Sequence, residues 1–470
     1  MGEVTLPLWG VIILAGLSLL LILDRLLVPG IRWYFRRRAN RLIDEINTRL
    51  DIEIRPFQLN QRHSLIDQLV FDEEVNKALL TYAQENNLPR EVAQDRVRQY
   101  AKEIVPSFNA YIYFRVGYWL ARRIARLIYR VRVAFFDDDR IADIDPEATV
   151  VFVMNHRSNM DYILVSFLAA EKTALSYAVG EWARIWPLQT LIRAMGAFFV
   201  RRNSDDPLYR RVLERYVHMA TRAGVCQAVF LEGGLSKDGA LREPRLGFID
   251  YMLRNYHPET DRDIVFVPVG INYDRVIEDR SLLRRLDPAV SKRSAWFVIK
   301  TSLKFLFKHL KLSRRNRWRR FGYAGVNFGK PVSVRQYCKD NKIAFSDMQH
   351  DIRFKAVDVL SSRLMSDIQE IIPILPVALM SQIVLDYRPD WKSELEIKRL
   401  ALDKIEDYRK RGAPINIAPN ACEGVLSTAM TMLISRRMLD EKDGLFRASD
   451  SSLDILSYYA NSIKSAKRTA

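Results

Sequence analysis

Short apolar runs alternate with longer stretches of helical spacing from residue 144 onward. Runs of this length are typical of buried strands, and they recur at Val150–Met154, Ala174–Val179, Ala197–Val200, Ala228–Leu231 and Ile264–Ile271. Between them, apolar residues return every three or four positions, as in Leu188–Met195 and Leu208–Ala223. Because strands that alternate with helices form sheets covered by helices on both faces, this region is predicted to be an α/β domain.

The region before this alternation looks mainly helical. Helices are expected at Asn40–Leu50, Asp72–Gln84 and Pro89–Ile104, where the proline suits the start of a helix. The stretch Ala110–Val133 is rich in arginine and aromatic residues. That composition fits either a helical packing domain or a platform lying on a membrane, and no candidate chemistry stands out there.

The region after the alternation starts with Val326–Val332, which looks like a last strand. The chain then turns helical again, with apolar helix faces in Ala356–Ile368 and Cys422–Leu439. Between those faces Pro373 and Pro376 interrupt an apolar run, so a helix there must start late or be kinked.

The apolar run Leu6–Leu23 is about long enough to cross a bilayer. Glu3 is the one charged side chain before it, whereas arginines follow it, so it lacks the basic start of a signal peptide. The positive-inside rule then places the rest of the chain in the cytoplasm. Trp9, Trp33 and Tyr34 suit anchoring at the two interfaces. The alternative is a helix that lies on the membrane without spanning it.

The composition adds a strong positive charge, with 73 Lys and Arg against 56 Asp and Glu and a net charge of +17. Anionic partners are therefore expected: phosphates, an acidic membrane surface or nucleic acid. Trp296–Leu312 carries lysines along an apolar stretch, the pattern of a basic interfacial helix. Since aromatic RNA-binding motifs are missing from the sequence, anionic lipid is favoured over nucleic acid.

The chain has three cysteines, Cys226, Cys338 and Cys422, which lie far apart in the sequence. Their spacing supports neither a disulfide framework nor a zinc site. Unpaired cysteines fit a reducing compartment.

The stretch Val150–Ala170 carries the first candidate chemistry. It opens as a strand, passes through a polar turn and continues as a helix that Ser158 or Asn159 could cap. His156 is expected at the carboxyl end of the strand and Asp161 in the first helical turn. Ligands bind at this edge of open α/β sheets, and a histidine held by a carboxylate is the usual general base. A structural histidine and an aspartate that favours the helix dipole form the plainer alternative.

Two further stretches place candidate groups at predicted strands. Arg201 and Arg202 directly follow the strand Ala197–Val200, and guanidinium groups match phosphate oxygens in pairs. A solvated charge pair is the alternative. Pro268 interrupts the strand Ile264–Ile271, which favours an edge strand or a bulge that opens the sheet beside a pocket.

The stretch Phe230–Gly239 ends another strand in a glycine-rich turn, with Glu232 at its lip. Gly233 and Gly234 let backbone amides approach an anion closely, although such a turn is most often only a turn. Two basic side chains that could add charge, Lys237 and Arg245, follow in the sequence.

Four segments, in the order NHRSNMD, GAFFVRR, FLEGGLSKDG and VFVPVGI, together resemble the signature blocks of the glycerolipid acyltransferases, with the HxxxxD motif in the first block. They look most like the membrane-bound glycerol-3-phosphate and dihydroxyacetone-phosphate acyltransferase branch. The segments DPLY, VNFGKP, PVAL and LSYYANSI are similar to the same branch, so the resemblance covers most of the chain from about residue 110. It implies a mixed sheet flanked by helices.

The resemblance implies acyl transfer from acyl-CoA or acyl-carrier protein to the sn-1 hydroxyl of glycerol 3-phosphate, which gives lysophosphatidic acid for phospholipid synthesis. His156 is implied as the base and Asp161 as the residue that orients it. Backbone amides of the first-block turn or of the Gly233–Gly234 loop are the implied oxyanion donors. Neither a metal nor a cofactor is needed. The implied substrate-binding residues are Arg201, Arg202, Glu232, Gly233, Gly234, Lys237 and Arg245, with Pro268 in a fourth-block pocket.

One position departs from the pattern of the family, which usually has an arginine where this chain has Leu235. Lys237, Arg242 or Arg245 compensates, or the phosphate of the acceptor is bound differently. Dihydroxyacetone phosphate and a lysophospholipid therefore stay open as acceptors. A non-catalytic membrane lipid-binding protein on the same scaffold is the alternative from a different class, and retention of His156 and Asp161 argues against it.

The expected organisation has four parts. They are a transmembrane helix over residues 1–30, a helical membrane-proximal region over 31–135, the acyltransferase catalytic domain over 136–335 and a C-terminal helical region over 336–470. The expected location is a membrane, crossed once, with the catalytic domain in the cytoplasm; in a bacterium this would be the inner or cell membrane.

Overall fold

The structure is a computed structural model, and it describes residues 54–60, 62–135, 144–169, 173–180, 184, 188–201, 204–284, 320–417 and 422–464. The chain divides into two compact units, Met1–Leu50 and Asp51–Ala470, and all of the described residues belong to the second. Three predicted segments lie outside them: the transmembrane helix, the helix at 40–50 and the basic interfacial helix at 296–312. Among the described helices, none combines the length and the apolar character that crossing a bilayer requires.

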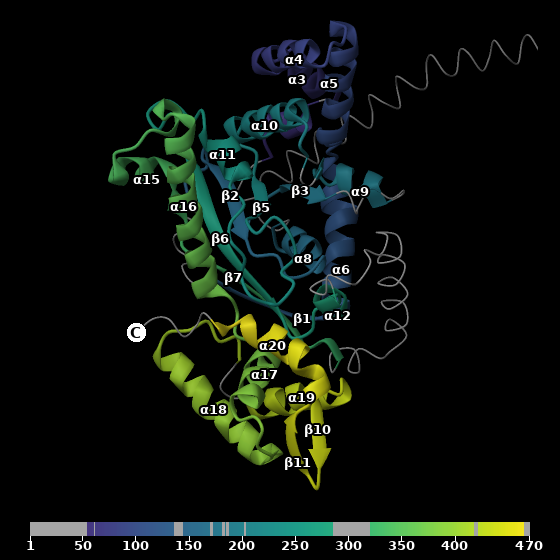
Figure 1. Ribbon diagram of the computed structural model, residues 1–470, viewed down its shortest axis with the longest axis vertical. Helices are drawn as coiled ribbons and strands as arrows, with labels where there is room; N and C mark the ends of the chain where they lie inside the picture. Colours follow the sequence, from purple (N-terminus) through teal and green to yellow (C-terminus); the bar gives the residue numbers. More distant parts are fainter. Residues whose placement is uncertain are drawn as a thin grey trace, which may run out of the picture. The chain divides into compact units, whose positions relative to one another are not determined.

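The core of the described unit is one mixed sheet of eight strands in the order β1-β7-β6-β2-β5-β3-β4, with β8 also paired to β6 (Figure 1). Strands β2, β5, β3 and β4 run parallel to one another and to β6, whereas β7 and β8 pair antiparallel with β6. The α/β fold with a mixed sheet is therefore confirmed. The strands are β1 Arg130–Phe135, β2 Thr149–Met154, β3 Ser176–Gly180, β4 Phe198–Val200, β5 Gln227–Phe230, β6 Ile264–Tyr273, β7 Tyr323–Phe328 and β8 Val332–Ser333.

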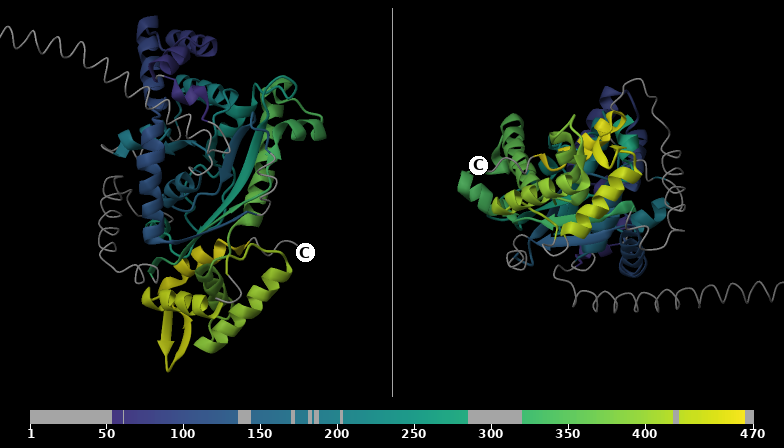
Figure 2. Two further views of the ribbon diagram at one scale, coloured as in Figure 1. Left: turned by 180° about the vertical axis from the view of Figure 1, so that it is seen from behind. Right: turned by 90° about the horizontal axis from the view of Figure 1, so that it is seen from below.

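Helices cover both faces of this sheet, as the views in Figures 1 and 2 show. All six residues of β2 are buried, as expected for a strand with helices on both sides. Val150, Phe152 and Met154 join one apolar core, and Val151 and Val153 join the other. The first core includes residues of α6 Tyr118–Ile128, α8 Met160–Ala169 and the C-terminal helices, and the second includes residues of α10 Pro207–Arg222, α11 Gly247–Leu253 and α16 His350–Ile371.

The N-terminal helices α4 Glu73–Glu85 and α5 Arg90–Ile104 lie where the sequence predicts them. Asp72 caps α4 by accepting hydrogen bonds from two backbone amides. The helix α3 Arg62–Val70 was not predicted. The remaining short helices of the described unit are α2 Pro56–Leu59, η1 Ile112–Gly117, α9 Leu188–Ala194, α12 Asp279–Leu283, α15 Val334–Asn341 and η4 Phe345–Asp347.

The helical prediction for Ala110–Val133 is wrong at its end. The helix stops at Ile128, and Arg130–Phe135 forms β1, which pairs with β7 at the edge of the main sheet. Arg130, Val131, Arg132 and Val133 alternate polar and apolar side chains, which is the pattern of a strand with one exposed face.

Pro268 does not lie in an edge strand, so that alternative of the prediction is wrong. It lies in β6, beside Val153 of β2. On the other side of β6, pairing with β8 ends at Phe266 and pairing with β7 begins at Val269. The carbonyl of Pro268 accepts a hydrogen bond from the Gly329 amide there, at 2.9 Å. A proline is tolerated in this central strand because its missing N–H falls where the ladder changes partners.

The C-terminal region is helical but also holds a small sheet that the helical prediction missed. Strands β10 Leu439–Lys442 and β11 Leu445–Ala448 form a hairpin, and β9 Lys392–Ser393 pairs with β11. Asp443 and Gly444 at the hairpin tip both have positive φ, as the two-residue turn of a hairpin requires. The helices are α17 Pro376–Asp386, which starts at the predicted proline, α18 Glu394–Lys410, α19 Cys422–Ser435 and α20 Leu453–Asn461, with a short η6 at Asp450–Ser452.

Candidate active site

A cavity of about 500 Å³ opens at the carboxyl ends of the parallel strands. His156 follows β2, Arg201 follows β4 and Glu232 follows β5, and all three line it. Because these strands run parallel, their carboxyl ends meet at one edge of the sheet, as the sequence predicted. The cavity also receives the side chains of Tyr162, Lys237, Arg242 and Arg245.

His156 and Asp161 form a buried pair, with His156 Nδ1 2.8 Å from Asp161 Oδ2. The same carboxylate oxygen accepts the backbone amides of Arg157 at 2.7 Å and Ser158 at 3.0 Å. The polar turn between β2 and α8 therefore folds around Asp161, which lies in the first turn of α8. Ser158 also caps the helix, because its hydroxyl accepts the amide of Met160 at 3.1 Å.

This arrangement fixes which nitrogen of His156 carries the proton. Asp161 Oδ2 already accepts two backbone N–H groups, so Nδ1 must be the donor toward it. The other ring nitrogen, Nε2, is then the acceptor. It is buried and has no hydrogen-bond partner among the described residues. His156 thus presents an unused lone pair at the wall of the cavity, which is what a general base needs.

Tyr273, at the end of β6, is a site residue that the sequence did not reveal. Its hydroxyl donates to Asp161 Oδ1 at 2.6 Å, so both oxygens of the carboxylate are engaged. Burial, together with the Asp161 charge, raises the pKa of Tyr273 well above its ordinary value, so the hydroxyl keeps its proton. Its position five residues beyond Pro268, in a run of buried strand residues, gave no sequence signal of its own.

Two aromatic rings hold the imidazole in place. The ring of Phe230 stacks on His156 with centroids 4.0 Å apart, and Tyr162 meets it edge-on at 5.4 Å. Phe230 is the last residue of β5 and Tyr162 follows Asp161 in α8, so neighbouring elements of the first and third sequence blocks clamp the histidine from two sides.

Glu232 accepts hydrogen bonds from two backbone amides of the site. Its Oε1 accepts the amide of His156 at 2.8 Å and its Oε2 accepts the amide of Arg242 at 3.1 Å. The side chain is 1% exposed, and burial raises the pKa of Glu232 to about 7. Glu232 lines the cavity, but its two oxygens join the first-block turn to the third-block turn. Contact with a phosphate is therefore not its role in this geometry.

Arg201 lines the cavity but is paired. Its guanidinium makes two hydrogen bonds to the Glu103 carboxylate, at 2.9 and 2.8 Å, and lies 5.0 Å from the ring centroids of both Tyr100 and Tyr209. Glu103 also pairs with Arg184. The second predicted arginine, Arg202, lies outside the described residues.

Lys237, Arg242 and Arg245 are exposed at the cavity and form no ion pair with any described residue. They follow the Glu-Gly-Gly turn. Leu235, which is half-buried against the apolar core, lines the same cavity. Three cations therefore line the same cavity as Leu235, which stands where the family usually has an arginine. An anionic ligand fits here, because these charges have no internal partner to leave.

Three consecutive backbone amides of the first-block turn are not available for an oxyanion. Those of His156, Arg157 and Ser158 already donate to carboxylates. In the third-block turn, the amide of Gly233 donates to the carbonyl of Phe230. The next two amides, of Gly234 and Leu235, have no partner within the part of the chain that the structure describes. Of the two predicted oxyanion sites, the glycine loop is the one that the geometry favours.

Gly233 and Gly239 bracket this loop, and both need the left-handed conformation, with φ of 63° and 87°. A Cβ on Gly233 would lie 2.8 Å from Arg245 Cγ, and one on Gly239 would lie 1.8 Å from the carbonyl oxygen of Tyr458. Pro268, the predicted fourth-block pocket residue, is not among the described residues that line the cavity.

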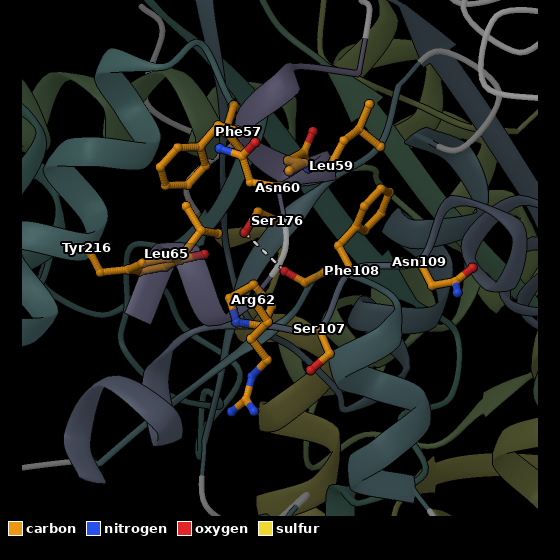
Figure 3. A pocket seen from close by; sticks show the side chains of 14 residues that line it. Phe57, Leu59, Asn60, Arg62, Leu65, Ser107, Phe108, Asn109, Ser176 and Tyr216 are labelled. Carbon is orange, nitrogen blue, oxygen red and sulfur yellow. Dashed lines mark hydrogen bonds between the residues drawn. The ribbon is translucent and has the colours of Figure 1, made fainter. Parts of the chain in front are cut away.

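A second cavity, of about 260 Å³, lies where β3 and β5 begin, at the opposite edge of the sheet. Figure 3 shows its side chains, including Phe57, Phe108 and Tyr216. Its one charged side chain, Arg62, bonds the carbonyls of Lys102 and Val105 at the end of α5. It holds no acid–base pair, so the first cavity is the candidate site. Across the described residues, no group of three or more His, Cys, Asp or Glu side chains is placed to hold a metal ion.

Two family profiles match the chain. The one described as Acyltransferase covers residues 136–272, which include all the catalytic-turn and glycine-loop residues above. The one described as Glycerol-3-phosphate acyltransferase C-terminal region covers residues 306–465.

Similar curated proteins include the glycerol-3-phosphate acyltransferases of Pseudomonas putida and Xanthomonas axonopodis. The first is 27% identical over 91% of this chain and 51% of its own length, and the second is 26% identical over 86% and 46%. This chain therefore spans about half the length of the curated relatives it matches. A solved 1-acyl-sn-glycerophosphate acyltransferase of Thermotoga maritima superposes on 53% of this chain and 80% of its own at 16% identity, with a TM-score of 0.28, which is too weak a likeness to carry an argument.

The raised pKa of Glu232 predicts a pH-dependent stability. An acid with a raised pKa holds its proton more tightly in the folded than in the unfolded state, so stability falls as pH rises from its ordinary value, about 4.3, through about 7. We expect wild type to lose about 2 kcal/mol more than Glu232→Gln between pH 5 and pH 8. Urea unfolding at the two pH values measures this difference, and equal losses in both proteins would contradict it.

Proposed function

We propose that the chain is a glycerolipid acyltransferase, as the two matching family profiles support, and that it transfers a fatty acyl group from acyl-CoA or acyl-carrier protein to the sn-1 hydroxyl of glycerol 3-phosphate, giving lysophosphatidic acid. One observation carries the proposal. Among the described residues, the buried Nε2 atom of His156 has no hydrogen-bond partner, and its ring, which Asp161 orients, lines the same cavity as three cations that form no ion pair. A base beside an anion-binding wall suits an acceptor with a hydroxyl and a phosphate.

In the proposed reaction, His156 Nε2 removes the proton from the acceptor hydroxyl as its oxygen attacks the thioester carbonyl carbon. Asp161 stabilises the imidazolium that forms. The carbonyl oxygen becomes an oxyanion, for which the amides of Gly234 and Leu235, in the loop that lines the cavity, are the proposed donors. When the intermediate collapses, the carbon–sulfur bond breaks and the leaving thiolate takes the proton from His156. The histidine is then neutral again, and no acyl-enzyme forms.

The phosphate of the acceptor is assigned to Lys237, Arg242 and Arg245. These side chains can meet an anion without breaking an existing ion pair, whereas Arg201 must first leave Glu103 or bind the anion while still paired with it. The apolar run Leu6–Leu23 and the arginines after it support a single-pass membrane location, with the catalytic residues on the cytoplasmic side.

The first prediction concerns the base. His156→Ala should lower acyl transfer from acyl-CoA to glycerol 3-phosphate by about a hundredfold to ten-thousandfold, the usual contribution of a general base. His350 offers a matched control, because it also contacts an aspartate, Asp351, at 3.0 Å, but on the exposed surface. His350→Ala should keep wild-type turnover. The base assignment fails if His156→Ala keeps it too.

The second prediction concerns Tyr273, a positioning residue that acts through Asp161. Tyr273→Phe should lower kcat about tenfold and leave KM for glycerol 3-phosphate nearly unchanged, because it removes one hydrogen bond that orients the carboxylate. Tyr129→Phe is the control. It removes a buried hydroxyl that bonds the carbonyl of Arg275, 2.7 Å away, in a ring packed against Tyr273. Equal losses of kcat in both variants would mean that packing, and not the bond to Asp161, matters.

The third prediction concerns the acceptor phosphate. Arg245→Gln should raise KM for glycerol 3-phosphate about tenfold with kcat little changed, since it removes a charge that binds substrate and transition state alike. Arg262→Gln, at the opposite edge of the sheet and paired with Glu147, should not. Running the same assay with dihydroxyacetone phosphate and a lysophospholipid shows which acceptor has the highest kcat/KM. An unchanged KM for every phosphorylated acceptor would overturn the assignment of the phosphate site.

A further inference from the structure

A band of arginine and aromatic side chains covers the outer face of η1 and α6. Its members follow a three- to four-residue spacing, so they share one side of the helix: Tyr111, Arg115, Val116, Trp119, Arg122, Arg123 and Arg126. We call this the η1–α6 face. All seven are exposed, and Trp119 and Tyr111 keep 58% and 54% of their surface accessible.

The opposite side of the same helices is firmly packed. Tyr113, Gly117, Ala121, Ala125 and Ile128 are buried. A Cβ on Gly117 would lie 2.9 Å from the end of the Met195 side chain, so the helix sits close to the residue that follows α9. The helices also pack against α8, where the ring of Tyr118 lies 6.1 Å from that of Phe167. The exposed band is therefore held on a rigid support beside the helix that carries Asp161.

The charge on this face is of one sign. No Asp or Glu occurs between Ile104 and Phe136. Arg115, Arg122, Arg123 and Arg126 form no ion pair with any residue that the structure describes. Some arginines instead lie over aromatic rings, as Arg123 does over Trp119 at 5.7 Å.

The helix α18 shows that exposed apolar residues alone do not produce this pattern. Leu395 on α18 is 79% exposed. The charges around it are mixed and paired along the helix, as in Lys398–Glu394 and Lys410–Glu406. The charges around Leu395 are thus balanced within α18, whereas the arginines of the η1–α6 face have no acidic partner among the described residues and its largest aromatic ring, Trp119, stays 58% exposed.

We propose that the η1–α6 face lies against a bilayer that contains anionic phospholipid. Unpaired arginines are attracted to lipid phosphates, and a tryptophan between them has the amphipathic ring that settles at the headgroup level. A single-stranded nucleic acid would match the charge as well, but it needs a groove with stacked rings, and this face is the convex side of one helix. The contact brings α8 and the cavity beside it close to the membrane surface.

A dye on the face tests this in the full-length protein. The three native cysteines, Cys226, Cys338 and Cys422, are all buried, so a polarity-sensitive thiol dye can be directed to Val116→Cys. Leu395→Cys on α18 is the matched control. The labelled proteins are placed in nanodiscs of phosphatidylcholine alone or of equal parts phosphatidylcholine and phosphatidylglycerol.

We expect a blue shift of the dye at position 116 in the anionic discs, weakened by salt, and none at position 395. Each arginine should contribute roughly fivefold to the docking equilibrium, so Arg122→Gln with Arg126→Gln should weaken it about twenty- to thirtyfold. Equal spectra in both kinds of disc, or a shift at 116 that only added RNA produces, would overturn the proposal. If Val116→Cys does not fold, Tyr111→Cys serves the same purpose. Since the readout needs no substrate, its outcome is independent of the proposed acyl transfer.

Discussion

The site depends on one buried carboxylate that accepts four hydrogen bonds. Asp161 takes the imidazole N–H of His156, the backbone amides of Arg157 and Ser158, and the hydroxyl of Tyr273. A buried charge is costly unless it is fully bonded, and here the bonds come from the turn after β2 and from the end of β6. The same contacts that make the charge tolerable also shape the turn, select the histidine tautomer and tie two neighbouring strands together.

The C-terminal region is part of this support. Glu278, just before α12, accepts the hydroxyl of Ser158 and the side-chain amide of Asn159, at 2.7 and 3.1 Å. The next residue, Asp279, bonds the hydroxyl of Tyr459 at 2.6 Å and pairs with Arg436. Buried hydrogen bonds to two adjacent acids, Glu278 and Asp279, thus connect α20 and the residue after α19 to the first-block turn. The close approach of Gly239 to the backbone of α20 couples the glycine loop to the same helices.

The sequence could predict the parts of the site that follow from strand order. His156 and Glu232 end parallel strands, and such ends meet at one edge. It could not predict the partner of Arg201, because Glu103 lies 98 residues earlier in the chain. Nor could it predict Tyr273, whose buried ring looks like core until the hydroxyl is placed. The hairpin at Asp443–Gly444 was different, since an Asp-Gly pair is a local turn signal that a helical interpretation overlooks.

The acidic and the basic side chains of the site differ in burial. The carboxylates of Asp161 and Glu232 are buried and bonded to backbone amides, so they shape the site without repelling an anion. Cations such as Arg245 stay exposed at the cavity and form no ion pair with any described residue. At this edge of the sheet the excess of basic residues in the sequence therefore produces a local positive potential near His156 Nε2, which has no partner among the described residues.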